Sequence, residues 1–351
     1  MSNKKKSITL TDIAAAAGVT PMTVSRVVNQ NGYVSAETRE NVLQVVKEMK
    51  YRPNGLARSL KLQKTKTIGL VLGDIANPFA AELARAVRDV TTRRGYNLFI
   101  CISEHNPKED VAAFDSLADH NIDGLIVATR SNHAGDKHLT EMIERGVRVV
   151  CIGRDFHHEN ADWVSADNHK GGFQATQHLI DFGHTKIGFI GTSLAGGASL
   201  KRFQGYLDAL KNNDLEIEER FISGGTATED APGYSTEKLG YEAMKRLLVL
   251  PNRPTAIFAR NDFTAIGAMS AIKESGLRIP QDVAIVGFDD IPMAVHTSPP
   301  LTTIRQPTRR QGSIAAESLL KRIESNEPLK REEKVLECEL IVRDSTSTQV
   351  N

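Results

Sequence analysis

Polar side chains follow the apolar segments of this chain at regular places, and their types suit the binding of a small ligand. They are Asp74, Asn77, Arg154, Asp167, Asn261 and Asp289, with Arg202 at the start of a helical stretch. Carboxylate, amide and guanidinium groups each make several hydrogen bonds, and Phe79 adds a ring face. The chemistry that these residues predict is recognition of a ligand that carries many hydroxyl groups.

Little in the sequence indicates catalysis. The glycine-rich stretch GTSLAGGASLKR follows an apolar run, but it has neither the GK[ST] ending of a nucleotide-binding loop nor the glycine spacing of a dinucleotide fingerprint. The chain contains no GxSxG nucleophile motif. The histidines His157, His158, His178 and His184 have no second cluster at metal-ligand spacing. We therefore expect no enzyme, no catalytic residue, no metal and no cofactor.

The elements that must position the polar residues alternate between strands and helices. From Lys66 onward, short apolar runs such as IGLVL, GLIVA, KIGFIG and DVAIVGF are separated by amphipathic stretches such as FAAELARAVRDVTTRRG. This alternation predicts buried parallel strands covered by helices, arranged as two doubly wound α/β lobes rather than one large sheet. Ligands bind beyond the carboxyl ends of the strands in such sheets, where the polar residues stand.

Arg154, and the aspartates that directly follow Asn261 and Asp289, have a second interpretation that involves no ligand. Asp262 and Asp290 could cap the helices that follow them. Arg154 could pair with Asp155 at the surface. Both interpretations stay open at the level of the sequence.

The charges are divided unevenly along the chain. Residues 1–66 contain 12 Lys and Arg against 4 Asp and Glu, whereas residues 67–351 contain 32 against 39. A small basic head on an acidic body is typical of a module that binds a polyanion. A solvated basic tail is the alternative, and it fits less well because helical patterns run through the charged residues.

The head itself predicts two short helices joined by a tight turn, followed by a third helix from about Ser35. Gly18 ends the first helix, Thr20 can cap the second, and Pro21 is suited to its first position. The expected core consists of Val24, Val27, Val28, Val42, Val45, Val46 and Met49. This arrangement is a helix-turn-helix with a three-helix core.

The other face of the second helix carries the side chains that could read DNA. With Thr20 at its start, they are Pro21, Met22, Ser25, Arg26 and Asn29. An arginine can bind O6 and N7 of guanine in the major groove, and a methionine can contact the methyl group of thymine. Ser25 and Asn29 suit phosphates or base edges. The alternative is an ordinary capped surface helix.

A basic segment, YRPNGLARSLKLQK, follows the third helix. An exposed leucine between basic residues is suited to enter the minor groove of DNA and unstack a base step. The residues of this segment that we expect to contact DNA are Asn54, Ala57, Arg58, Leu60 and Lys61.

The stretch DIAAAAGVTPMTVSRVVN, with VSAETRENVLQVVKEMKYRPN and LARSLK after it, resembles the DNA-binding head and hinge of the lactose/galactose repressor (LacI/GalR) family. The resemblance continues through KTIGLVLGDIANPFAAEL, RFQGYLDAL, ARNDFTAIGAM and RIPQDVAIVGFDD to PPLTTIRQP, almost the whole chain. It implies that Pro21 and Met22 set operator preference, that Arg26 reads a base and that Leu60 intercalates at the hinge.

For the body, the resemblance implies that Asp167, Arg202, Asn261 and Asp289 bind an effector. Asp74, Asn77, Phe79 and Arg154 are weaker members of this set. The implied protein is a sequence-specific, DNA-binding transcriptional regulator, and the family's usual output is repression, here of carbohydrate-utilisation genes under a sugar-like effector. A purine-type or protein corepressor is the alternative, and a stand-alone sugar-binding protein is the alternative from a different class.

The expected partners are a palindromic double-stranded operator, a small-molecule effector and a second copy of the chain in a homodimer. No apolar run reaches about 18 residues and no secretion signal is evident, so we expect a cytoplasmic protein without membrane contact. The expected fold is an all-α helix-turn-helix head with a hinge helix, followed by an α/β body of two doubly wound parallel-sheet lobes like those of periplasmic binding proteins.

The sequence also predicts boundaries for these parts. The head covers residues 1–52, the hinge and linker 53–65, the body 66–345 and a polar tail 346–351. Within the body, we expect an N-lobe of residues 66–166 and 298–331 and a C-lobe of residues 167–297 and 332–345.

Overall fold

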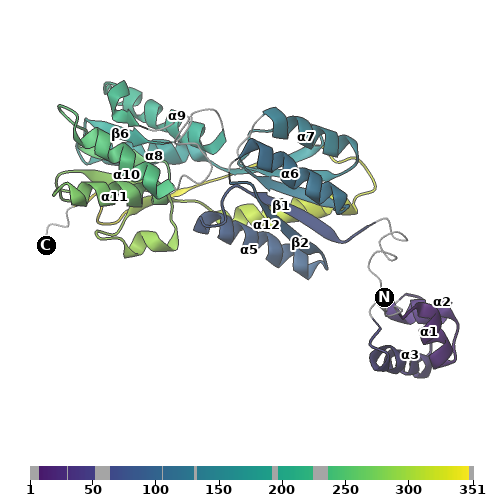
Figure 1. Cartoon of the computed structure of the whole chain (residues 1–351). Helices are drawn as coiled ribbons and strands as arrows, with labels where there is room; N and C mark the ends of the chain where they lie inside the picture. The colour runs from purple at the N-terminus through teal and green to yellow at the C-terminus, as the bar shows by residue number, and fades with distance from the viewer. Residues whose placement is uncertain are drawn as a thin grey trace, which may run out of the picture. The chain divides into compact units, whose positions relative to one another are not determined.

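The computed structural model of this chain describes residues 8–29, 31–51, 64–104, 106–129, 133–191, 197–223 and 236–347. The chain divides into two compact units, Met1–Thr65 and Lys66–Asn351 (Figure 1). The hinge residues expected to contact DNA, which are Asn54, Ala57, Arg58, Leu60 and Lys61, lie outside the described residues. No described helix is long and apolar enough to cross a bilayer.

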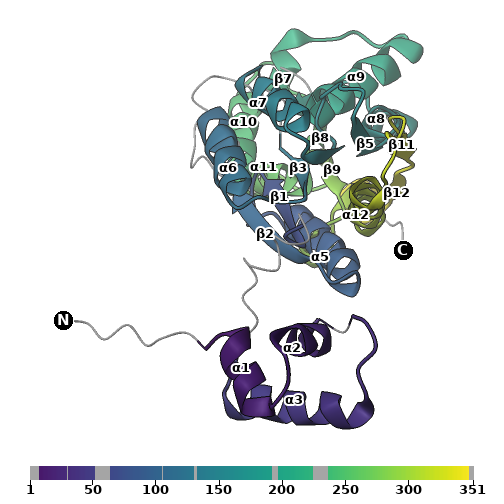
Figure 2. The same cartoon turned by 90° about the vertical axis from the view of Figure 1, so that its right-hand side faces the viewer.

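The first unit contains, in its described residues, the helices α1 (Leu10–Ala17), α2 (Pro21–Val28) and α3 (Ala36–Glu48) (Figure 2). Thr9 and Asp12 form a reciprocal capping box at the start of α1, and Gly18 ends it at φ +65°. Thr20 caps α2, since its Oγ1 accepts a hydrogen bond from the amide of Thr23 at 3.2 Å. The caps thus fix both ends of the turn between α1 and α2.

The core of the first unit is small. Its buried members are Ile13, Ala14, Ala17, Val24, Val27 and Val42. Val28, Val45, Val46 and Met49, also expected in this core, pack against it while partly buried. A core of this size holds α2 by two valines on one face and leaves its other face to solvent.

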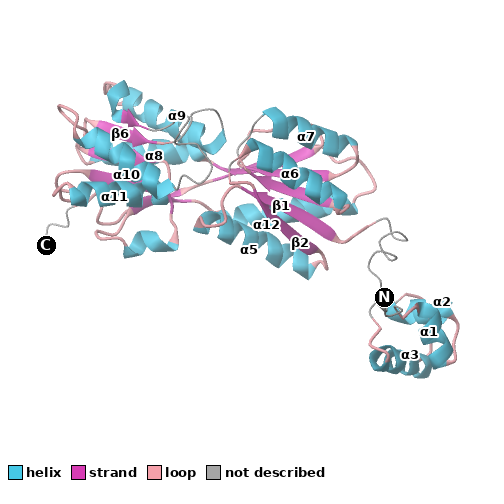
Figure 3. Cartoon of the chain, in the orientation of Figure 1, coloured by secondary structure: helices cyan, strands magenta, loops and turns pink. Residues whose placement is uncertain are grey.

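The described part of the second unit contains two six-stranded sheets. The N-lobe sheet has the order β11-β5-β4-β3-β1-β2, and the C-lobe sheet has the order β12-β10-β9-β8-β6-β7. Figure 3 draws the strands of both sheets in magenta and the helices in cyan. The N-lobe strands are β1 (Thr67–Leu72), β2 (Asn97–Ile102), β3 (Gly124–Ala128), β4 (Arg148–Ile152), β5 (Ala161–Ala166) and β11 (Glu333–Leu336). The C-lobe strands are β6 (Ile187–Ile190), β7 (Ile222–Ser223), β8 (Ala256–Ala259), β9 (Ala284–Asp289), β10 (Thr302–Arg305) and β12 (Glu339–Ile341).

Helices cover both faces of each sheet. The N-lobe helices are α5 (Pro78–Arg93), α6 (Pro107–Asp119), α7 (His133–Glu144) and α12 (Thr308–Glu324). The C-lobe helices are α8 (Asn168–Asp181), α9 (Gly197–Asn212), α10 (Thr236–Leu248) and α11 (Asp262–Glu274), with short 3₁₀ turns η1 (Glu219–Phe221) and η2 (Pro292–His296). In the N-lobe, α5 and α12 contribute to one hydrophobic core, and α6 and α7 contribute to a second. In the C-lobe, α10 and α11 contribute to one core, and α8 and α9 contribute to the other. The predicted two-lobed, doubly wound body is therefore confirmed.

Nearly all strand pairs are parallel, and most strands are followed by a helix that carries the chain to the next strand. Among the described pairs, β12 against β10 is antiparallel. Buried apolar runs make up the central strands: every residue of β1 and of β9 is buried. Such strands leave their functional groups to the residues that follow them.

The lobes exchange chain at three segments of the described body: between β5 and α8, between β10 and α12, and between β11 and β12. This corrects the expected boundaries. Residues 298–331 were assigned to the N-lobe, but β10 pairs with β9 in the C-lobe; β11 was assigned to the C-lobe, but it pairs with β5 in the N-lobe. The second crossing therefore lies at Gln306 and Pro307, next to the polar end of β9.

Two glycines bring α8 and α9 together closely. A Cβ added to Gly172 would lie 2.2 Å from the carbonyl oxygen of Arg202, and one added to Gly205 would lie 2.1 Å from that of His169. Any side chain at either position would force the helices apart. The close approach fixes the backbone from which the Arg202 side chain extends.

Candidate functional site

The outward face of α2 presents exposed side chains on a helix that its core holds in place. Met22 is 65% exposed, Pro21 and Arg26 are exposed, and Ser25 is half-buried. Behind them, Val24 and Val27 are buried. The spacing that predicted this face is confirmed, and the side chains on it have the lengths and groups that read a major groove.

Hydrogen bonds within α2 occupy some of these groups and leave others open. The Asn29 amide donates to the Ser25 carbonyl at 2.8 Å and approaches its Oγ at 3.2 Å, which closes the end of the helix. Among the described residues, the Arg26 guanidinium has no hydrogen-bond or ion-pair partner. Its stem lies beside Gly32, where an added Cβ would be 3.4 Å from the Arg26 Cδ. The aliphatic part of the Arg26 side chain thus packs beside Gly32, while its guanidinium group is available to bind DNA.

In the body, Arg202 forms the centre of a buried polar cluster. Its Nε donates to Oδ1 of Asn168 at 2.8 Å, and its Nη1 donates to the carbonyl of Arg260 at 2.5 Å. Its Nη2 lies 3.6 Å from Oδ1 of Asp289, and its guanidinium lies 3.7 Å from the ring centre of Phe288. Burial lowers the pKa of Arg202, which the nearby Asp289 carboxylate opposes. A guanidinium that is so fully paired is fixed in orientation.

Asp289 ends β9 in a strained backbone conformation, with φ at +117°. Gln306, at the second crossing, donates from Nε2 to Oδ1 of Asp289 at 2.6 Å. Burial raises the pKa of Asp289, while Arg202 and Gln306 act in the opposite direction. Backbone strain of about 1–3 kcal/mol persists only where the surroundings hold it, and it concentrates at functional sites. The geometry brings together Arg202 and Asp289, both expected site residues.

Gln306 was not among the expected residues, although the rule that found the others applies to it. It directly follows β10, the strand within PPLTTIRQP. The amide oxygen of Gln306 also accepts a hydrogen bond at 3.3 Å from Gln311, which belongs to α12 of the N-lobe. Gln306 therefore connects the end of a C-lobe strand to an N-lobe helix.

Asp262 is buried behind this cluster and does not cap a helix, which corrects the interpretation made from the sequence. Asn261 caps α11 instead, accepting from the amide of Thr264 at 2.9 Å. One carboxylate oxygen of Asp262 accepts from the amide of Ile291 at 2.8 Å and the other from the hydroxyl of Thr303 at 2.5 Å. Burial, and then the neighbouring Asp289 carboxylate, raise the pKa of Asp262 well above its ordinary value.

Asp290 is also not a helix cap. Its carboxylate pairs with Arg305 at 2.7 Å and with Arg343 at 2.6 Å. These two ion pairs join the end of β9 to β10 and to the segment after β12. The role of Asp290 in the described structure is to hold these segments together.

Arg154 lies inside the N-lobe, not at the surface with Asp155. Its guanidinium lies 2.7 Å from Asp136, 3.4 Å from Asp110 and 2.6 Å from the hydroxyl of Thr129. The side chain is fully buried. The interpretation as a surface pair with Asp155 is therefore wrong, because acceptors from α6, from α7 and from the residue after β3 surround the guanidinium.

The remaining expected ligand residues each use a side-chain oxygen to bind backbone amides. Asp74 accepts from Ala76 at 2.8 Å, Asn77 caps α5, and Asp167 caps α8. Asn261 caps α11 as described above. Each of these residues retains further hydrogen-bonding capacity, since a carboxylate or amide can make several bonds.

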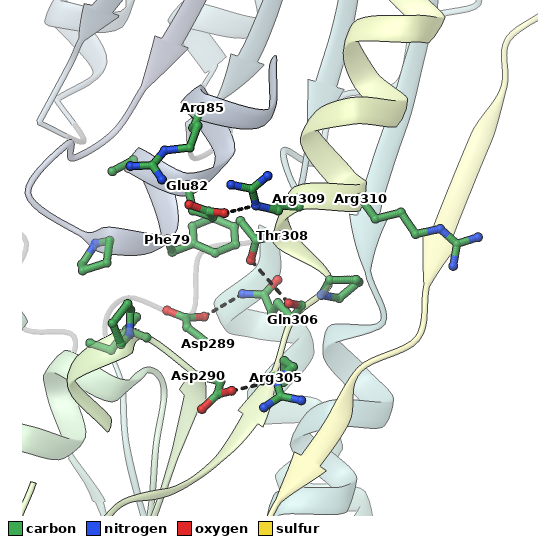
Figure 4. A pocket seen from close by; sticks show the side chains of 15 residues that line it. Phe79, Glu82, Arg85, Asp289, Asp290, Arg305, Gln306, Thr308, Arg309 and Arg310 are labelled. Carbon is green, nitrogen blue, oxygen red and sulfur yellow. Dashed lines mark hydrogen bonds and ion pairs between the residues drawn. The ribbon is translucent and has the colours of Figure 1, made fainter. Parts of the chain in front are cut away.

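A cavity of about 680 Å³ opens beside Asp289, between the N-lobe and the C-lobe. Figure 4 shows Phe79 between Glu82 and Arg309 on one side and Asp289 and Gln306 on the other. The cavity is lined by Pro78, Phe79, Ala81, Glu82, Arg85, Asp289, Asp290, Ile291, Pro292, Arg305, Gln306, Pro307, Thr308, Arg309 and Arg310. Its size falls within the range of about 300–1,000 Å³ that small-molecule sites occupy.

Comparisons with known proteins match the head and the body to separate domain families. Residues 9–54 match the family described as bacterial regulatory proteins, lacI family, and residues 176–346 match the periplasmic binding protein-like domain. The HTH-type transcriptional repressor PurR of Histophilus somni (strain 129Pt) is 36% identical over 342 residues, 97% of this chain and 99% of that protein. The ribose operon repressor of Haemophilus influenzae is 38% identical, over 96% of this chain and 98% of its own.

Two solved structures extend this similarity to the fold. The complex of the transcriptional regulator CelR with cellobiose has a TM-score of 0.71 at 34% identity, covering 96% of this chain and 99% of that one. The lac repressor dimer bound to operator and the anti-inducer ONPF has a TM-score of 0.84 at 27% identity, covering 98% of this chain and all of that one (100%).

Proposed function

The chain belongs to the lacI family of bacterial regulatory proteins, and from this membership we propose that it represses carbohydrate-utilisation genes under the control of a sugar-like ligand. It is a DNA-binding transcriptional regulator with an effector-binding body. The observation that carries the proposal is the buried Arg202–Asp289–Gln306 cluster beside the cavity, in a chain whose first unit has an open polar face on α2.

The head is the part that would bind operator DNA. Arg26 would bind a guanine edge, Met22 would contact a thymine methyl group, and Ser25 would bind phosphate or a base edge. A single small head makes few contacts, so tight binding needs two heads on a palindromic site. We infer that the protein works in the cytoplasm, as a regulator that catalyses no reaction.

The second copy would associate through the N-lobe. Strand β2 lies at the edge of its sheet, and Phe99 and Ile100 on it are 42% and 46% exposed. An uncovered edge strand with large apolar side chains on both faces is an aggregation hazard in a monomer. A homodimer that covers β2 removes this hazard and supplies the symmetry that a palindromic operator requires.

The ligand would bind beside Asp289 and Gln306, with a ring face against Phe79. Carboxylate and amide groups there accept and donate hydrogen bonds to hydroxyl groups. Two of the similar proteins have sugars in their names: one is a ribose operon repressor and the other is a complex of CelR with cellobiose. A purine corepressor is the second candidate, because the Phe79 ring also suits stacking on a flat base.

The ligand would act through the segments where the lobes exchange chain. Asn168 stands at the first crossing and binds Arg202; Gln306 stands at the second and binds Asp289. A ligand that contacts Asp289 and Phe79 touches both lobes, so it binds one lobe arrangement better than another. The difference between those two affinities sets how far operator affinity can shift.

The test is a thermal-shift screen of the full chain with sugars and purines, followed by DNA binding with each ligand that stabilises it. We expect a sugar to raise the melting temperature and change operator affinity, and Asp289→Asn to abolish both effects while DNA binding without ligand persists. Asp155→Asn is the matched control, since Asp155 is exposed and pairs with His157 at 3.2 Å. A purine hit would favour the second candidate, and an unchanged response in Asp289→Asn would contradict the assigned site.

A further inference from the structure

The cavity beside Asp289 has two walls of different charge. On one side of Phe79 lie Arg85, Glu82 and Arg309, and on the other lie Asp289 and Gln306 (Figure 4). We propose that its ligand carries an anionic group, phosphate or carboxylate, which Arg85 and Arg309 bind while its hydroxyl groups meet Asp289 and Gln306. This rests on the proposed function and narrows the chemical class of its effector.

The acidic side chains around the cavity already have basic partners. Asp289 already faces Arg202, and Asp290 already pairs with Arg305 and Arg343. Neither carboxylate therefore compensates the positive charge on the other side of Phe79. We call that side, formed by Arg85, Glu82 and Arg309, the basic wall.

The basic wall contains one carboxylate for two guanidinium groups. Glu82 pairs with Arg309, and Arg85 has no carboxylate partner among the residues that the structure describes. The group of Arg85, Glu82 and Arg309 thus has one excess positive charge facing the cavity, and both arginines are exposed. Charge-assisted hydrogen bonds from the two guanidinium groups would stabilise an anion in this position.

The N-terminal end of helix α12 lies at the cavity. Helix α12 has 17 residues, its N-cap position is Pro307, and no side chain of the described residues caps it. Its first turn contains no acidic residue, and neither does the first turn of α5. The positive end of α12 is therefore uncompensated at the same wall as Arg309, which favours a negative group there.

One face of helix α5 lines the cavity. Phe79, Glu82 and Arg85 are spaced by three residues and so share one face of the helix, which lines the cavity. Phe79 stands between the basic wall and Asp289. A ligand whose ring lies on Phe79 can reach the arginines with one end and Asp289 with the other. A volume of about 680 Å³ is far larger than an inorganic anion needs, so the cavity fits a whole anionic sugar.

Two kinds of molecule share this chemistry, a sugar phosphate and a sugar acid. Arginine binds both groups through paired N–H donors. Thermal shift and calorimetry on the full chain separate them with a fixed panel: glucose and ribose, glucose 6-phosphate and ribose 5-phosphate, gluconate and glucuronate, and inorganic phosphate alone.

We expect at least one phosphorylated or acidic sugar to bind more than tenfold tighter than its neutral parent. Arg85→Gln combined with Arg309→Gln should remove that preference and leave the neutral parent unaffected. Arg88→Gln is the matched control on the same helix, since Arg88 is exposed, pairs with Asp89 and does not line the cavity.

Three results would overturn the inference: equal affinity for neutral and anionic partners, an anion preference that survives the double substitution, or stabilisation by no anionic member of the panel. If neutral sugars bind and Asp289→Asn abolishes their binding, the proposed function stands and the anionic class fails. If no member of the panel changes either melting temperature or DNA binding, the proposed sugar-responsive function fails as well.

Discussion

The head and the body place their functional side chains in opposite environments. On α2, Arg26 and Met22 are exposed, and Arg26 has no partner within the described residues. In the body, Arg202 and Asp289 are buried and face each other. Exposed groups can change without loss of folding stability, whereas buried paired groups contribute to recognition and to stability together. The predictions below test that difference.

The largest expected effect is the loss of the head by a single core substitution. Val24 is fully buried in a core of six buried residues, so Val24→Asp places an unpaired charge there, at a cost of several kcal/mol. We expect the head to unfold and specific DNA binding to fall at least 100-fold. Leu43→Asp, at a residue that is 49% exposed on α3, is the control.

Protease digestion and circular dichroism of the full chain would report the state of the head, and the ligand-induced thermal shift would report the body. The body should be unaffected by Val24→Asp, since the two units have separate cores. Loss of the ligand response in this variant would contradict that separation.

The second effect is on body stability. Arg202→Met removes the cation beside the buried Asp289 and leaves an acceptor on Asn168 unpaired. Breaking a buried pair by removing one partner costs about 3–5 kcal/mol. Urea unfolding should show this loss, and Arg220→Met should show little, because Arg220 forms an exposed pair with Glu218. If Arg202→Met lost ligand binding but kept its stability, recognition and stability would be separate in the body as they are in the head. That result would contradict the difference described above.

The third effect separates recognition from stability in the head. Arg26→Ala should weaken specific DNA binding by about 1–3 kcal/mol if the guanidinium binds a guanine edge. The free energy of unfolding should change by less than about 0.5 kcal/mol, as for a surface residue. Equal losses on specific and random DNA, measured by fluorescence anisotropy, would assign Arg26 to a phosphate instead.

The smallest effect is a pH dependence of body stability. Burial raises the pKa of Asp262 in the folded state above its value in the unfolded chain. Its contribution to stability is therefore fully present below the unfolded pKa and is lost as the pH rises through the folded pKa. Asp262→Asn, which cannot ionise, should flatten this decline, whereas Asp155→Asn should keep it. Urea unfolding at a series of pH values measures the slope, and an unchanged slope in Asp262→Asn would contradict the assignment.

The sequence predicted the head better than the body for a physical reason. Spacing along one short helix decides which side chains share a face, so Val24, Val27 and Arg26 were assigned correctly to the inside and the outside of α2. No long-range contact is needed for that inference.

In the body, the rule that ligands bind after parallel strands located Asp289, and the same rule would have located Gln306. Asp262 and Arg154 could not be interpreted in this way, because their partners come from segments far away along the chain. Arg154 binds Asp110 and Asp136, and Asp262 binds Thr303.

The exchange of β10 and β11 between the expected lobes has a similar cause. Both are four-residue strands, and their sheet is decided by pairing with β9 and β5 across long sequence separations. The apolar pattern of a short strand does not predict which strand it pairs with.

The central claim is that the exposed face of α2 reads the DNA sequence, whereas the ligand bound at the buried cluster of the body changes the affinity for that DNA. The most direct test begins with selection of DNA from a random pool by the full chain. The selected sequence is then titrated, with fluorescence anisotropy as the readout, with wild type, Arg26→Ala and Asp289→Asn. Each titration is made with and without the ligand found by thermal shift.

The account predicts that wild type selects a two-fold symmetric sequence whose affinity changes with ligand. Arg26→Ala should lose the sequence preference, and Asp289→Asn should keep it but no longer respond to the ligand. Selection of no symmetric sequence, or a full ligand response in Asp289→Asn, would contradict the account.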